Sequence, residues 1–141
     1  MKALVAIDDS ENALRALRYI LDHQELLGTK PELVLVNVHR PVPSSRAKAV
    51  LGNDVIEQYY REEAEEALAP ARALLADKPF RVTERTIIGQ PAAQIIAAAK
   101  QDDCRLIVVG TQGRSALSDF FVGSVASRVI AESPIPVLSV K

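Results

Sequence analysis

Five short apolar runs, separated by segments with the periodicity of helices, constrain the fold of this chain more than any other feature of its sequence. The first and fourth runs are continuously apolar, which is typical of strands that are covered on both faces. The third run alternates apolar and polar residues, so we expect it nearer to an edge of the sheet. The expected strands are residues 3–7, 33–38, 81–88, 106–109 and 136–140.

A helical segment is expected between each strand and the next. The first should be capped by Ser10 and should end at Gly28. The third should begin at Pro91, and the fourth should extend to about Glu132, before Pro134.

The second helix is expected over residues 54–76, after a loop from Pro41 to about Asn53. Pro70 predicts a kink or a break in this helix, because proline removes one hydrogen bond from a helix interior. Its apolar side is expected to carry Val55, Ile56, Tyr59, Ala64, Ala67, Leu68 and Leu75.

This order of elements predicts the fold class. Parallel strands that are joined by helices cross over in a right-handed sense, which places helices on both faces of the sheet. We therefore expect an α/β fold: a single-domain, open, parallel five-stranded sheet of the Rossmann-like type. The length of 141 residues and the absence of internal repeats predict one domain over residues 1–141.

Composition excludes several classes of function. The formal net charge is −1, only 4% of residues are aromatic and Trp is absent, so neither a broad nucleic-acid-binding face nor a polybasic membrane patch is expected. No apolar run approaches the length of a membrane span, and the run before Asp8 is too short for a signal-peptide core. We therefore expect a cytoplasmic protein. Cys104 is the only cysteine, which excludes an intramolecular disulfide and a cysteine-based zinc site.

The binding site of such a sheet lies outside the carboxyl ends of its strands, where the strand order reverses. This rule selects four loops, and the richest is the loop after the fourth strand. Its glycines allow a backbone to approach a phosphate closely, and the N-terminus of the following helix attracts anions. Arg114 adds a planar cation suited to phosphate oxygens. Alternatively, the glycines serve only as turn and cap residues, but their position between a strand and a helix favours phosphate binding.

The spacing Gly-x2-Gly-x9-Gly-Ser, from Gly110 to Ser124, resembles the ATP-binding signature of universal stress proteins. The resemblance covers essentially the whole chain, and includes the run 5–8 with Ser10, the pair Asn37-Val38, and residues 134–138. It implies the fold variant shared with adenine nucleotide alpha hydrolases, and an ATP-binding, dimeric stress-response regulator.

The resemblance also implies a role for individual residues. Asp8 would face the ribose or the base, Val38 would contact adenine through its backbone, and Gly110 would lie beside the ribose. A Mg²⁺ ion would accompany the triphosphate. The residues expected to cradle the phosphates are Gly113, Arg114, Gly123, Ser124 and Val125, and Ala6 and Ile7 are expected to line the same cofactor site.

The chain departs from the family pattern at two places. Asp9 stands where many relatives carry Gly, and a second carboxylate there would either repel phosphate or help to hold a metal. Phe120 and Phe121 lie where aliphatic residues are common, and we expect them to pack under the loop.

Two alternatives to an ATP-binding regulator remain at this point. One is a slow ATP hydrolase, for which Asp8, Asp9 and His39 are the candidates to orient water. The other is a dimeric interaction module that does not use nucleotide, which Asp9 favours. A phosphorylated receiver domain is excluded, because the third strand does not end in the required Asp.

The last strand is expected at an edge of the sheet, where it could pair with a second copy of the chain. The resemblance implies the same use of residues 137–140, and Pro134 and Pro136 would confine the pairing to the end of the strand. We thus expect a homodimer that binds an adenine nucleotide, together with a protein partner that the sequence does not identify.

Overall fold

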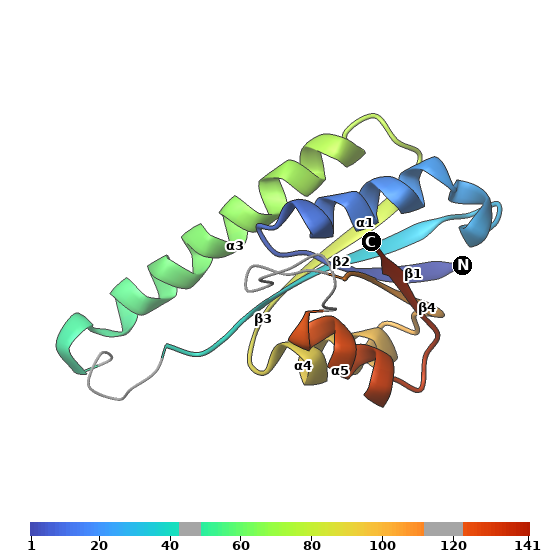
Figure 1. The fold of residues 1–141 in the computed structure, drawn as a ribbon. Coiled ribbons are helices and arrows are strands. Elements are labelled where there is room, and N and C mark those ends of the chain that lie inside the picture. Colours follow the sequence, from blue (N-terminus) through green and yellow to red (C-terminus); the bar gives the residue numbers. More distant parts are fainter. Residues whose placement is uncertain (43–48, 112–122) are drawn as a thin grey trace.

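One parallel sheet contains the five strands β1 (Lys2–Ala6), β2 (Glu32–His39), β3 (Arg81–Ile88), β4 (Leu106–Gly110) and β5 (Val137–Val140). The strand order is β3-β2-β1-β4-β5 in the computed structural model, which describes residues 1–42, 49–111 and 123–141 (Figure 1). The predicted fold class is therefore confirmed, with β3 and β5 at the two edges.

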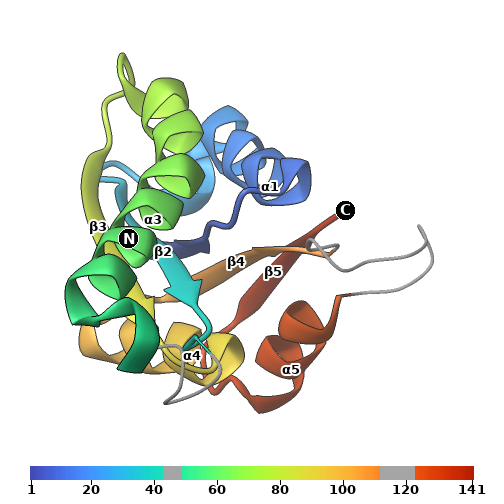
Figure 2. The same ribbon diagram turned by 90° about the vertical axis from the view of Figure 1, so that its left-hand side faces the viewer.

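Helices cover both faces of this sheet (Figure 2). The helices α1 (Glu11–Asp22) and α3 (Asn53–Leu75) pack on one face, and α4 (Pro91–Gln101) and α5 (Ser124–Glu132) pack on the other. The side chains of β1 point alternately to the two faces. Ala3 and Val5 pack with the layer of α1 and α3, and Leu4 packs with the layer of α4 and α5. Burial on both sides explains why this strand is continuously apolar.

The helix α1 begins as predicted, but it ends earlier than Gly28. The Oγ atom of Ser10 accepts a hydrogen bond from the backbone N–H of Ala13 (3.2 Å) and caps the helix. The prediction for its other end was wrong, because the N–H of His23 bonds back to the carbonyls of Tyr19 and Ile20 and closes α1 at Asp22. A short 3₁₀ helix, η1 (Gln24–Leu27), follows, and Gly28 ends it with a φ of 76°.

The helix α3 runs through Pro70 without the break that the sequence predicted. Pro70 lies on the solvent side, where water is able to bond the Glu66 carbonyl that proline leaves without a partner. Two residues expected on the apolar side, Val55 and Tyr59, are instead 54% and 46% exposed, while Tyr60 is buried. The reason is that the N-terminal part of α3 projects past the sheet (Figure 1).

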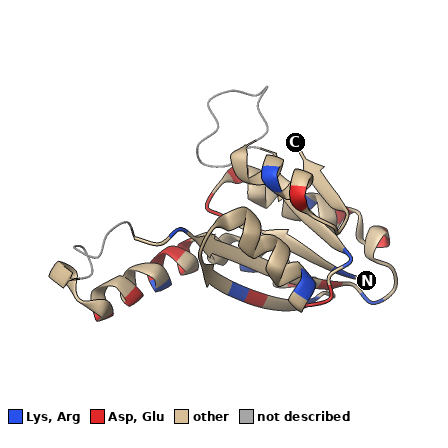
Figure 3. Ribbon diagram, turned by 90° about the horizontal axis from the view of Figure 1, so that it is seen from below, with Lys and Arg blue, Asp and Glu red and all other residues tan. Residues whose placement is uncertain are grey.

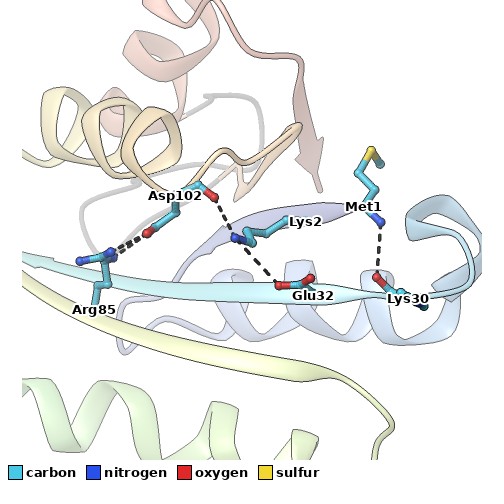
Figure 4. Close-up of polar contacts among 6 residues, drawn as sticks. All are labelled: Met1, Lys2, Lys30, Glu32, Arg85 and Asp102. Atoms are coloured by element: carbon cyan, nitrogen blue, oxygen red, sulfur yellow. Dashed lines mark hydrogen bonds and ion pairs between the residues drawn. The ribbon is translucent and has the colours of Figure 1, made fainter.

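Ion pairs and hydrogen bonds tie the sheet strands to one another and to the end of α4 (Figure 4). The Nζ atom of Lys2 donates to the carbonyl of Asp102 (3.0 Å) and lies 3.9 Å from the carboxylate of Glu32. The guanidinium of Arg85 binds the Asp102 carboxylate through two nitrogens. The amino group of Met1 donates to the carbonyl of Lys30 (3.4 Å). These polar groups are thus occupied in holding β1, β2, β3 and the end of α4 together.

Charged residues of both signs are interspersed over the described residues (Figure 3). Within the described residues, none of the helices is both long enough and apolar enough to span a membrane.

Two glycines at the ends of strands give a matched test of packing. A Cβ atom on Gly110 would lie 2.7 Å from the backbone C and O atoms of Asn12, whereas one on Gly89 would meet the flexible side chain of Gln94. Gly110→Ala should therefore lower the free energy of unfolding by about 1–3 kcal/mol, because the start of α1 must move. Gly89→Ala should change it by less than about 1 kcal/mol. Chemical denaturation followed by circular dichroism measures both, and equal effects would contradict this account.

Cys104 should be unreactive in the folded protein. The side chain is 4% exposed, and burial, aided by the Asp102 carboxylate, raises the pKa of its thiol from 9.0 to about 11. At pH 8 the folded chain should therefore label with iodoacetamide at least about 100-fold more slowly than the chain unfolded in guanidinium. As a control, Glu57→Cys adds an exposed thiol and should gain one rapidly labelled site. Labelling of Cys104 as rapid as that of the added thiol would contradict this account and show that the core around Cys104 opens readily.

Candidate functional site

A cavity of about 770 Å³ opens at the carboxyl ends of β1, β2 and β4. Residues of α3 and of the start of α5 complete its walls. The strand order reverses at β1, whose neighbours are β2 and β4, so the cavity lies where the rule for parallel sheets predicts a ligand. Its volume falls in the range of about 300–1,000 Å³ that is usual for small-molecule sites.

The structure brings eight of the ten predicted site residues together around this cavity. They are Ala6, Ile7, Asp8, Val38, Gly110, Gly123, Ser124 and Val125. Gly113, Arg114, Phe120 and Phe121 lie outside the described residues. The part that each residue takes in binding a ligand stays a prediction.

Asp8 is held by the start of α1. Its Oδ1 atom accepts hydrogen bonds from the backbone N–H of Ser10 (2.9 Å) and from the Ser10 hydroxyl, the same hydroxyl that caps the helix. The Oδ2 atom has no partner among the described residues. One carboxylate oxygen is thus fixed by the fold, while the other remains able to accept a bond from a ligand.

Asn37 is the main site residue that sequence reasoning did not single out. It is 4% exposed, it lines the cavity, and its Nδ2 atom donates to the carbonyl of Ile7 (2.9 Å). The Oδ1 atom is buried without a hydrogen-bond partner among the described residues. The signal in the sequence was an amide residue inside the apolar run 33–38.

The bond from Asn37 leaves backbone groups of Val38 unpaired. The ladder between β1 and β2 ends with the pair Ala6–Val36 and the bond from Ile7 N to Val36 O (2.8 Å). If β1 continued, the Ile7 carbonyl would accept the N–H of Val38, but the Asn37 amide takes that position. The N–H and C=O of Val38 therefore face the side where β1 has ended, and no described residue pairs with them.

The N-terminus of α5 forms another part of the cavity wall. Gly123 precedes the helix without a side-chain cap, unlike Ser10 before α1 and Gln90 before α4. No described group accepts the backbone N–H groups of Ser124 and Val125. Unfilled N–H groups and the helix dipole behind them make this end of the cavity attractive to anions.

The end of the cavity at α3 has the opposite character. Val55 and Tyr59 lie one turn apart on α3, and Leu51 precedes the helix, before Gly52. These three residues form a half-exposed apolar stripe at the cavity. Glu63 lies beside this stripe, with an Oε2 atom 3.6 Å from Nε2 of His39, and Glu66 also lines the cavity. Carboxylates and apolar groups disfavour a phosphate here.

Aromatic rings gather at the same end. The ring of His39 lies 6.0 Å from that of Tyr59 and 5.6 Å from that of Tyr60. The hydroxyl of Tyr60 accepts the backbone N–H of Val42 (2.7 Å), which ties the chain after β2 to α3. These flat, partly apolar surfaces suit a planar ring better than a charged group.

No group of three or more His, Cys, Asp or Glu side chains that could hold a metal occurs among the described residues. Asp8 and Asp9 are adjacent at the cavity, but two carboxylates do not make a complete set of ligands.

Comparison with known proteins identifies the family. The family model for the universal stress protein family matches residues 1–141. A universal stress protein of Thermus aquaticus, encoded in the QAH/OAS sulfhydrylase 3′ region, is 34% identical over 141 residues, covering 98% of this chain and 96% of that protein.

Solved structures agree. The structure of MJ0577, for which a structure-based assignment of biochemical function is described, matches with a TM-score of 0.83 and 28% identity over 99% of this chain and 94% of that one. The universal stress protein of Archaeoglobus fulgidus in complex with dAMP matches with a TM-score of 0.67 and 26% identity, over 100% and 98% of the two chains. The resemblance inferred from the sequence is confirmed: this chain belongs to the universal stress protein family.

Proposed function

We propose that this protein binds an adenine nucleotide, ATP in particular, in the cavity at the carboxyl ends of β1, β2 and β4. One observation carries the proposal: the unpaired N–H and C=O groups of Val38 and the unfilled N-terminus of α5 open into the same cavity. The N–H and C=O of Val38 suit the edge of a base, and the N–H groups at the start of α5 suit a phosphate.

The backbone of Val38 favours adenine over guanine. A neighbouring donor and acceptor match the ring nitrogen and the exocyclic amino group of adenine, which present an acceptor beside a donor. Guanine presents the reverse order on that edge, so two like groups would face each other and remain unpaired. The rings of His39 and Tyr59 add apolar surface beside this position.

The phosphates belong at the other end of the cavity. Ser124 and Val125 offer backbone N–H groups there. The carboxylates of Glu63 and Glu66 oppose the reverse orientation. The bound dAMP of the Archaeoglobus fulgidus relative supports a nucleotide of this type, and Gly113 and Arg114 complete the proposed phosphate cradle.

A Mg²⁺ ion fits this site as a companion of the nucleotide rather than as a resident metal. The described residues supply no complete set of protein ligands. Mg²⁺ commonly binds through phosphate oxygens, waters and one or two carboxylates. Asp8 and Asp9 are the carboxylates that would serve, and the ion would reduce their repulsion of the phosphates.

We propose that nucleotide binding has a regulatory role, in a dimeric protein of the cytoplasm. The cavity wall includes the half-exposed stripe of Leu51, Val55 and Tyr59, so an occupied cavity presents a different surface from an empty one. A protein partner that recognises this surface would respond to nucleotide.

The first test measures the melting temperature of the protein with ATP, AMP or GTP, with and without Mg²⁺. A ligand that binds only the folded state raises the melting temperature, and the shift grows with the logarithm of the ligand concentration above the dissociation constant. We expect concentration-dependent shifts with both adenine nucleotides and a much smaller shift with GTP. The absence of any shift at millimolar ATP would favour a dimeric module that does not use nucleotide.

A pair of substitutions at Ser124 tests the helix N-terminus. Ser124→Pro removes one N–H donor, and proline is tolerated at the first position of a helix after a residue with the extended ψ of Gly123, 153°. Ser124→Ala removes only the hydroxyl. Titration calorimetry with ATP should show a loss of about tenfold or more in affinity for the proline variant beyond that of the alanine variant. Equal affinities would contradict the placement of the phosphates.

The edge strand β5 supports a homodimer. The carbonyl of Pro136 accepts the N–H of Ile107 in β4, and that of Val140 accepts the N–H of Thr111 just after β4 (2.9 Å each). The backbone of Ser139 between them therefore faces away from the sheet. Antiparallel pairing of two such edges around a twofold axis would close both.

Ser139→Pro should therefore prevent dimerisation without removing a bond to β4, because it deletes only an outward N–H group. Light scattering after size-exclusion chromatography should give the mass of a monomer for this variant and of a dimer for Ser139→Ala. A dimer that persists in the proline variant would place the interface elsewhere.

A further inference from the structure

The N-terminal half of α3 leaves apolar side chains in contact with solvent. This half of the helix projects past the sheet (Figure 1), and its Val55 and Tyr59 are half-exposed. Leu51 and Val50, just before the helix, are 52% and 83% exposed. Single exposed apolar residues are common, but several that lie near one another mark a surface that interacts with another molecule.

The same part of α3 holds an excess of negative charge. Residues 53–66 carry one arginine and six carboxylates, a net charge of −5. Because the whole chain has a net charge of −1, the remaining residues sum to +4. Acidic residues colour the projecting part of the helix red in Figure 3. The negative charge of this protein is thus concentrated where its apolar side chains are exposed.

Apolar and acidic side chains share one face of the helix. Glu62 and Glu66 follow Val55 and Tyr59 by seven residues each, which is two helical turns, so all four lie on the same side. Arg61 follows Tyr59 by two residues and therefore lies on the opposite side. Among the described residues, no cation pairs with Glu62 or Glu66. The face has an apolar half and an acidic half, and extends about 16 Å along the helix.

The charge of this face restricts what can cover it. Carboxylates repel the phosphates of nucleic acids and of anionic lipids, so neither is a suitable occupant. A helix that carries apolar residues next to Lys or Arg matches both halves of the face. The apolar stripe also lines the cavity, so the surface is hollowed beside α3, as a docked helix requires.

We infer that this face of α3, formed by Val55, Tyr59, Glu62 and Glu66, binds a basic amphipathic helix of another protein. The apolar residues of that helix cover Val55 and Tyr59, and its cations lie beside the two carboxylates. The inference deepens the regulatory part of the proposed function, because it names the chemistry of the partner. Tyr59 and Glu66 also line the cavity, so the docked helix lies beside the proposed nucleotide, whose negative charge adds to the attraction. ATP should therefore raise the affinity for the helix, and the helix should raise the affinity for ATP by the same factor.

The test uses a synthetic peptide of about 18 residues, labelled with fluorescein, in which Leu, Ala and Lys follow the pattern of an amphipathic helix. Fluorescence anisotropy measures its binding to the full-length protein, with and without ATP. Two control peptides have the same residues in scrambled order, or Glu in place of every Lys. The basic amphipathic peptide should bind at least about tenfold more tightly than either control, and more tightly with ATP than without it.

Two variants separate the halves of the face. Val55→Ser removes exposed apolar surface, and Glu62→Gln with Glu66→Gln removes both carboxylates. Each should weaken binding of the basic peptide about fivefold or more, and the glutamine variant should also lose part of the dependence on salt. Circular dichroism checks that these variants, changed at exposed positions, remain folded.

The matched control is Asp54→Asn with Glu57→Gln. It removes two carboxylates from the same part of α3, so the net charge changes equally, but Glu57 is two residues from both Val55 and Tyr59 and lies on the other side of the helix. The affinity for the basic peptide should change by less than about twofold.

The outcomes distinguish this inference from the proposed function. Equal binding of the three peptides, or equal losses in the two double variants, would overturn the docking face and leave nucleotide binding intact. Binding of the basic peptide that ATP does not change would keep the docking face and overturn the regulatory role of the nucleotide. Light scattering of the protein alone should give the same mass with and without Val55→Ser. A lower mass for the variant would show that a second copy of the chain covers this face, and would overturn the inference.

Discussion

The hydrogen bond from the Asn37 amide to the carbonyl of Ile7 is the interaction on which the site depends. It fastens β1 to β2 at the point where their ladder stops, and so fixes the position of Asp8 and of the start of α1. It also occupies the carbonyl that would otherwise pair with Val38. A single side chain thus closes the sheet and leaves one backbone donor and acceptor open to a ligand. The strand order then places this open end beside β4 and α5, because β1 is the strand at which the order reverses.

From that starting point the cavity acquires two unlike ends. Side chains of α3 supply apolar surface and carboxylates, while the uncapped start of α5 supplies N–H groups. The projection of α3 past the sheet is essential to this arrangement, because it leaves Val55 and Tyr59 uncovered by the core and free to line the cavity. An elongated ligand with one planar end and one anionic end has only one favourable orientation in such a space. The polarity of the whole cavity, as well as individual contacts, therefore favours one orientation of the proposed ligand.

Sequence alone predicted the sheet, its edges and the end of the sheet at which a cavity opens, because continuous apolar runs and the rule for parallel strands depend only on local pattern. It did not predict Asn37, since a polar residue in a buried strand becomes informative only when its partner on another strand is known. Periodicity also did not separate Tyr59 from Tyr60, because it does not report how far a helix extends beyond the sheet. Gly110 was predicted as a residue that lets the backbone approach a ligand closely, yet the structure gives a different steric reason for glycine: the backbone of Asn12 leaves no space for a Cβ atom. The N–H and C=O of Val38 are unpaired because β1 stops before it reaches them. Sequence patterns do not predict the end of a strand to within one or two residues, so this feature was not predicted.

The balance of charge around the cavity gives the departure at Asp9 a physical meaning. Four carboxylates line the cavity, those of Asp8, Asp9, Glu63 and Glu66, against one described arginine, Arg40. A free nucleoside triphosphate entering this space would meet a net repulsion, which the N–H groups at the start of α5 oppose. A bound Mg²⁺ cancels part of the phosphate charge and converts two of the nearby carboxylates from repelling groups into groups that attract the complex. The acidic lining is therefore compatible with the proposed nucleotide when its phosphates lie toward the start of α5 and arrive with their counterion.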